Sequence, residues 1–144
     1  MFGLKTYSIS KGKHYSGFRF RPFIRKSEMT VIVNFDESCR YLGNTIQMTE
    51  QINKLCGFGA ILHHRNSIRI GWRYCPFNDH ILLYTYEYKK GVRIIDKFDK
   101  VKIGQTKKLK LKSKRVYWFG CYRFPYFGGK STAPHDMKIN LSFF

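Results

Sequence analysis

Hydrophobic and polar residues alternate in a strand-like way along nearly the whole chain. In residues 18–23 aromatic side chains alternate with arginines, and in residues 68–74 every second side chain is apolar. Residues 29–35 are rich in β-branched side chains, which is typical of a core strand. Because the side chains of a strand point alternately to its two faces, these patterns predict strands with one buried face. The same patterns predict further strands at residues 81–88, 92–95, 116–124 and 137–144.

One segment has a helical pattern instead. Ile52, Leu55 and Cys56 are spaced as on one face of a helix, with Thr49 as its N-cap and Gly57 as its stop signal. We therefore expect one short helix around residues 49–56.

These elements predict an all-β fold. About nine short strands, with turn signals about every 8–12 residues, are typical of an antiparallel two-sheet β-sandwich, jelly-roll-like in its topology, and an eight-stranded barrel is the alternative. The 144 residues contain no internal repeat, linker or change in composition. We therefore expect a single β-sandwich domain over residues 1–144.

The chain is strongly basic. It has 27 Lys and Arg residues against 9 Asp and Glu residues, for a formal net charge of +18. Aromatic residues make up 17% of the chain, which excludes a disordered tail because such tails lack large side chains to bury. The charge indicates a polyanion, a membrane surface or an acidic protein as the partner. We expect no membrane span, because no apolar run is long enough, and no secretory signal, because residues 1–5 contain no apolar h-region.

The cysteines do not have the spacing of a zinc or redox motif. Cys39, Cys56, Cys75 and Cys121 include no C-x-x-C pair. Four free and mostly buried thiols are expected, with two disulfides as the alternative. We expect no metal site and no cofactor.

The densest basic segment spans residues 107–115, in which six of nine side chains are basic. As a strand it would place its two leucines, Leu109 and Leu111, on one face. The other face would carry the lysines that we predict to bind a polyanion: Lys108, Lys110, Lys112 and Lys114. The alternative is an edge strand that carries lysines to prevent aggregation.

Four arginines are predicted as further polyanion contacts: Arg19, Arg21, Arg69 and Arg73. The first two alternate with aromatic residues, an arrangement found in stacking platforms for single-stranded nucleic acid. In a sandwich strand, however, the aromatic residues would point inward and the arginines would only face water. Trp72 and Trp118 both fall in predicted core strands, and the chain has only four Glu residues, so glycan hydrolysis is not expected.

A small-ligand or hydrolytic site is a further hypothesis. Its residues would be His63, His64, Asn66, His135 and Asp136. Neighbouring histidines on a strand point to opposite faces, so His63 and His64 cannot both bind one metal ion without a bend. We assign no catalytic residue, and a hydrogen-bonded polar cluster is the alternative.

Three stretches together resemble small uncharacterised proteins of phages and Bacteroidota. They are residues 35–41, the run from residue 52 to residue 73, and residues 125–129 with residues 133–136. The resemblance implies a β-sandwich of jelly-roll or concanavalin-like type and a phage origin, and it implies no activity.

The sequence thus predicts a non-enzymatic binding module. Its partner would be a polyanion, namely nucleic acid, or an acidic protein surface. A cytoplasmic or virion-associated location is expected. One alternative is a structural protein associated with the virion or capsid. The other is the small-ligand or hydrolytic site built on His63, His64, His135 and Asp136.

Overall fold

Strands account for nearly all of the regular structure. The computed structural model describes residues 4–17, 21–42, 51–60, 62, 65–128 and 131–143. Its strands are β1 (Lys5–Ile9), β2 (Pro22–Phe35), β3 (Asn53–Gly59), β4 (Asn66–Cys75), β5 (His80–Lys89), β6 (Val92–Lys102), β7 (Thr106–Arg123) and β8 (Met137–Phe143). Within the described ranges the only helical element is a single 3-10 turn, η1 (Glu37–Cys39). No helix in these ranges is both long enough and apolar enough to cross a membrane.

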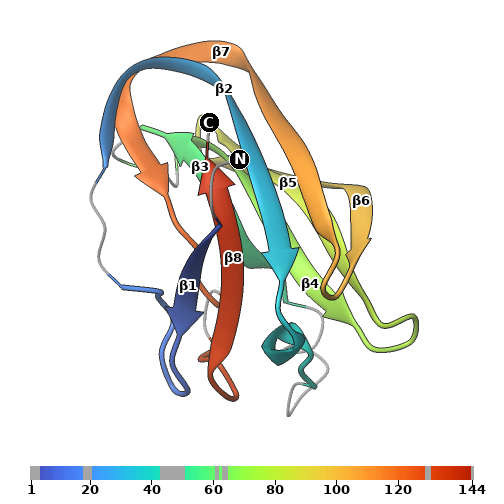
Figure 1. Cartoon of the computed structure of the whole chain (residues 1–144). Coiled ribbons are helices and arrows are strands. Elements are labelled where there is room, and N and C mark those ends of the chain that lie inside the picture. The colour runs from blue at the N-terminus through green and yellow to red at the C-terminus, as the bar shows by residue number, and fades with distance from the viewer. Residues whose placement is uncertain are drawn as a thin grey trace.

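All eight strands belong to one antiparallel sheet. The strand order is β1-β8-β2-β7-β3-β4-β5-β6, so β1 and β6 are its edges (Figure 1). The hydrogen-bonded ladders of the described residues do not join these two edges. An all-β antiparallel architecture is therefore confirmed, as one continuous open sheet.

The long strands β2 and β7 bend together and form the arch at the top of Figure 1. Their register shifts at the bend: Glu28 pairs with Lys112, but Lys26 pairs with Tyr117. A step of two residues in β2 therefore matches a step of five in β7, which is a bulge that increases the local bend. Arg25 lies in the same bend with φ 57, a left-handed conformation that is uncommon outside glycine.

The bend folds the sheet over its own core. The rings of Phe35 on β2 and Trp72 on β4 lie 5.3 Å apart, although β7 and β3 stand between these strands in the ladder. Both side chains are fully buried. Edge strand β6 also returns to the start of β7, where Lys107 pairs with Asp99 at 2.7 Å and donates to the Lys100 carbonyl. The concave side of the sheet therefore holds the hydrophobic core.

The helix expected around residues 49–56 is wrong where the structure describes it, because residues 53–59 form β3. Residues 49 and 50 lie outside the described ranges. All seven positions of β3 are buried, so the strand lacks the alternation that marks a half-exposed strand. A register shift between Lys54 and Cys56 disturbs the period of two further. The apolar spacing that resembled a helix therefore comes from the burial of both faces of β3 together with this bulge.

The four thiols form no disulfide, as the composition led us to expect. Cys39, Cys56 and Cys121 are buried and Cys75 is half-buried. Burial raises the pKa of the Cys39 and Cys56 thiols well above the ordinary value. These two cysteines are therefore inert core residues.

The two tryptophans give a direct test of the folded-over sheet, because Trp72 is 0% exposed and Trp118 is 63% exposed. We expect Trp72→Ala to lower the free energy of unfolding by about 3–5 kcal/mol, because it leaves a cavity in the core. Trp118→Ala should cost less than about 1 kcal/mol. Urea unfolding followed by circular dichroism measures both. Equal losses in the two variants would contradict the fold.

Candidate nucleic-acid interface

A row of lysines follows the outer face of the first half of β7. Lys108, Lys110 and Lys112 are exposed, and they alternate with the buried residues Leu109 and Leu111. This placement confirms the two faces predicted from the sequence. Neighbouring lysines of the row lie about 6.7 Å apart along the strand, and Lys114 continues the row, exposed, into the bulge of the arch. We call Lys108, Lys110, Lys112 and Lys114 the lysine row.

Acidic residues neutralise little of this row. Lys110 has an ion pair with Glu28 at 3.7 Å, and both side chains are at least half exposed. Among the described residues, the remaining ion pairs take up Arg40 and Lys107 and involve no other member of the row. The first half of β7 pairs with β2 alone in the described ladders. Its lysines therefore also lie along a strand edge, as the protective alternative requires.

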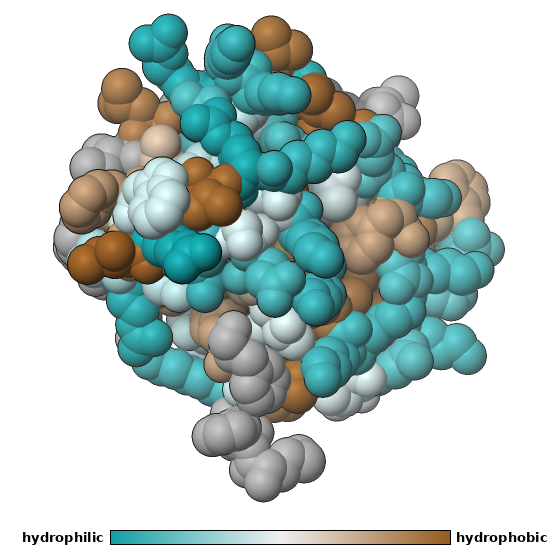
Figure 2. All heavy atoms as spheres, turned by 90° about the horizontal axis from the view of Figure 1, so that it is seen from above, coloured by the Kyte–Doolittle hydropathy of each residue, from teal (hydrophilic) through white to brown (hydrophobic). Residues whose placement is uncertain are grey.

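The lysine row leads to exposed aromatic side chains on the arch. Trp118 is 63% exposed, Phe119 is 74% exposed, and Ile24 of the paired strand is 77% exposed. The Arg25 guanidinium lies 5.5 Å from the centre of the Trp118 ring. Figure 2 looks down on this end of the molecule and shows apolar and aromatic groups among hydrophilic ones. We call Ile24, Arg25, Trp118 and Phe119 the arch patch.

The prediction that Trp118 belongs to the core is wrong. Neighbouring residues on a strand point to opposite faces, yet both Trp118 and Phe119 are exposed. Both faces of β7 are therefore in water at this point, because the arch projects beyond the core. Solvent-exposed aromatic groups beside cations can stack on bases, and a structural core residue cannot.

The predicted arginines do not join the lysine row. Arg21 is exposed just before β2, and Arg73 is half-buried on β4. Arg69 is only 1% exposed, and it lies on the face of β4 that points away from the core residues Ile68 and Ile70. Arg19 lies outside the described residues. The predicted cations therefore lie on two separate surfaces. The lysine row is on the outer face of the half that contains β2 and β7, and Arg69 is on the outer face of the half that contains β4.

Arg69 and Lys54 form a buried basic cluster with tyrosines. The Arg69 guanidinium carbon lies 5.0 Å from the centre of the Tyr86 ring, and its Nη1 donates to the Tyr126 hydroxyl at 3.5 Å. Lys54 is 5% exposed, and its Nζ lies 3.9 Å from the centre of the same Tyr86 ring. The Arg93 guanidinium on β6 donates to the Tyr86 hydroxyl at 3.5 Å. We call these five residues the basic–tyrosine cluster.

The cluster shifts the titration of its own members. Burial lowers the pKa of Lys54 to about 8, and the positive charges of Arg69 and Arg93 add to this effect. Burial alone would raise the pKa of Tyr86, but a hydrogen bond with Tyr88 and the charges of Lys54 and Arg93 lower it overall. No sequence pattern predicted this cluster, because each of its five residues comes from a different segment of the chain.

The hypothetical polar site is not assembled from its described members. Asn66 is at the start of β4, where its Oδ1 accepts from Arg115 at 2.6 Å. His135 Nε2 lies 2.6 Å from the carbonyl oxygen of Ser38 in η1, and the Asp136 carboxylate accepts a hydrogen bond from the Lys11 backbone at 2.8 Å. η1 lies at the opposite end of β4, because neighbouring Arg40 pairs with Asp79 just beyond that strand. His63 and His64 lie outside the described residues.

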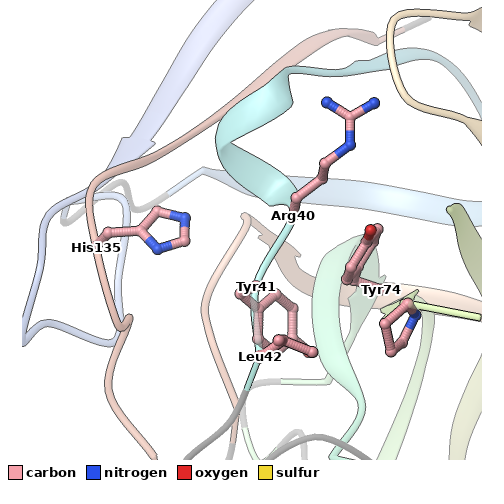
Figure 3. A pocket seen from close by; sticks show the side chains of 6 residues that line it. Arg40, Tyr41, Leu42, Tyr74 and His135 are labelled. Carbon is pink, nitrogen blue, oxygen red and sulfur yellow. The ribbon is translucent and has the colours of Figure 1, made fainter.

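His135 also borders an open pocket of about 380 Å³. Arg40, Tyr41, Leu42 and Tyr74 surround the pocket, and His135 lies to one side of it (Figure 3). The polar groups of the rim bind one another: Arg40 donates two hydrogen bonds to the Asp79 carboxylate, and Tyr74 donates one. The bonds from Arg40 and Tyr74 lower the pKa of Asp79 to about 2. These bonds give the rim a structural role.

Comparison of the chain with protein-family models, curated proteins and solved structures found no match.

The buried ammonium of Lys54 predicts a specific pH dependence of stability. The pKa of Lys54 is about 8 in the folded chain and has its ordinary value of 10.5 in the unfolded chain. Between these values the unfolded chain binds more protons, so stability rises with pH. Relative to Lys54→Met, the wild-type protein should gain up to about 3 kcal/mol between pH 8 and pH 10.5.

Urea unfolding across this pH range measures the difference. Lys97→Met is the matched control, because Lys97 is exposed on β6, and its pH profile should parallel that of the wild type. Parallel profiles for wild type and Lys54→Met would show that Lys54 titrates normally.

Proposed function

We propose that this chain is a non-enzymatic module that binds single-stranded nucleic acid along β7. The observation that carries the proposal is the continuity of the lysine row with the arch patch on one strand. The folded-over sheet would serve as the scaffold, in an arrangement like a jelly-roll sandwich.

The lysine row would bind the phosphates. A row of exposed ammonium groups releases condensed counterions when it meets a nucleic-acid backbone, and this release is the main source of sequence-independent affinity. One of its four lysines has an acidic partner, and that pair is solvent-exposed. Exposed pairs contribute about 0–1 kcal/mol, so breaking it costs little.

The arch patch would bind the bases. Stacking of a base on an aromatic side chain contributes about 1–3 kcal/mol and tolerates any sequence. Trp118 and Phe119 are available for this contact, and Arg25 adds a cation beside the Trp118 ring. A strand that carried lysines only to prevent aggregation would not need exposed aromatic residues next to them. The arch patch therefore favours binding over the protective alternative.

Neutralising three members of the lysine row should weaken binding and flatten its salt dependence. For Lys108→Gln, Lys112→Gln and Lys114→Gln combined, we expect the slope of log K against log salt to fall by about 2, at roughly 0.7 per phosphate contact. Fluorescence anisotropy with a labelled single-stranded oligonucleotide measures it. The matched control removes the same charge from β6, as Lys97→Gln, Lys100→Gln and Lys102→Gln, which are all exposed. Equal losses in the two triple variants would contradict a localised interface.

Removing the aromatic ring of the arch should weaken single-strand binding without changing its salt slope. For Trp118→Ala we expect a loss of about 5-fold to 150-fold, which corresponds to one stacked base. Phe77→Ala is the control, because Phe77 is 95% exposed in the turn between β4 and β5, away from the arch.

A second measurement separates nucleic acid from lipid. Anionic vesicles replace the oligonucleotide in the same assay. If Trp118→Ala abolished vesicle binding and left oligonucleotide binding intact, the arch patch would be a membrane contact, and the proposed function would be wrong.

A further inference from the structure

The basic–tyrosine cluster concentrates positive charge where no carboxylate of the described residues neutralises it. Arg69 and Lys54 are 1% and 5% exposed, and none of the ion pairs in the described part of the chain includes them. A buried cation that lacks a counterion costs several kcal/mol, and proteins normally pair it. Arg93 adds a third positive charge at the Tyr86 hydroxyl. Among the described residues the cluster therefore has no carboxylate partner.

Arg69 has donor capacity that the chain itself does not use. Its Nε is buried and has no hydrogen-bond partner, and its bond to the Tyr126 hydroxyl is long, at 3.5 Å. A guanidinium group has five N–H donors in a planar fork that matches the oxygens of a phosphate. Buried donors without partners are rare in folded proteins, and this one could donate to an added acceptor.

The backbone of β3 makes room for this charge. Gly57 pairs with Arg69 on one side and with Arg123 on the other, so both arginines flank a residue without a side chain. A Cβ atom at Gly57 would lie 2.6 Å from Arg69 Cγ and 2.3 Å from the Ile68 carbonyl oxygen. The glycine thus allows the Arg69 side chain to lie against the strand.

Arg93 connects the cluster to solvent. Arg93 is exposed on the edge strand β6, and its guanidinium contacts the Tyr86 hydroxyl that lies among the buried members. On the opposite side, Tyr15 covers Tyr126 with the ring centres 5.6 Å apart, and Tyr15 is itself 67% exposed. Arg93 is therefore the member of the cluster that an anion from solvent would contact first.

We propose that the basic–tyrosine cluster is a binding site for a phosphate-type oxyanion, separate from the interface on β7. Arg69, Lys54 and Arg93 would supply the charge, and the Tyr86 and Tyr126 hydroxyls would supply further hydrogen bonds. The site does not depend on the proposed function, because the lysine row lies on the outer face of the other half of the sheet.

Thermal unfolding with sodium phosphate tests the proposal, with sodium chloride at equal ionic strength as the reference. A ligand that binds only the folded state stabilises it in a saturable way. We expect phosphate to raise the Tm of the wild type beyond chloride. In Lys54→Met and in Arg69→Lys, which keeps the charge but loses the fork, the phosphate affinity should fall at least fivefold.

The triple glutamine variant of the lysine row is the control, and it should keep the full response to phosphate. The proposal would be overturned if phosphate did not raise the Tm of the wild type beyond chloride. It would also be overturned if the rise were equal in Lys54→Met, because that result would show only general screening of the net charge. Absorbance of tyrosinate near neutral pH in phosphate-free buffer would also overturn it, because Tyr86 would then be the counterion itself.

The same assay distinguishes the sources of the anion. A 5′-phosphorylated dinucleotide that stabilises the protein more than its unphosphorylated form does, and more than free phosphate does, would identify the end of a nucleic-acid chain as the ligand. Stabilisation by inorganic phosphate alone would identify a free ion.

Discussion

The pairing of β2 with β7 through their shared bend is the constraint on which the rest of the structure depends. Because the two strands stay hydrogen-bonded across the bulge between Lys26 and Glu28, one sheet can cover both sides of its own core. The contact between Phe35 and Trp72 exists only because the sheet folds over in this way. The same bend places the lysine row on one outer face, the basic–tyrosine cluster on the other, and the arch patch at the crest between them.

The two groups of cations differ in how the protein accommodates their charge. Side chains of the lysine row extend into water, where solvent and salt screen their repulsion. Arg69 and Lys54 lie under tyrosine rings, whose negatively polarised faces attract a cation but do not neutralise it. A surface of the first kind suits a long flexible polyanion with little preference for sequence. A site of the second kind suits a small ligand of fixed geometry.

The sequence predicted what depends on local alternation and missed what depends on distant contacts. The lysines and leucines of β7 were assigned to the correct faces, since that strand has water on one side and the core on the other. Trp118 was assigned to the core instead of the surface. Its exposure results from a bulge in the pairing with β2, whose residues are about ninety positions earlier in the chain. In β3 the second face is buried as well, which removed the alternation and left a pattern that resembled a helix. Arg69 follows the predicted outward direction, but its cover comes from Tyr86 and Tyr126, which no local pattern could indicate.

The side-chain contact of Lys107 on β7 with Asp99 on β6 has a consequence for how the molecule moves. A short turn joins these two strands, but no ladder of the described residues connects them, and the pair of Lys107 with Asp99 holds them together. The outward amides of β6 therefore have no ladder partner on that side. Local opening should therefore begin where β6 meets the start of β7, and the amides of β6 should exchange their hydrogens fast. The amides of β3 and β4 should exchange only when the whole chain unfolds.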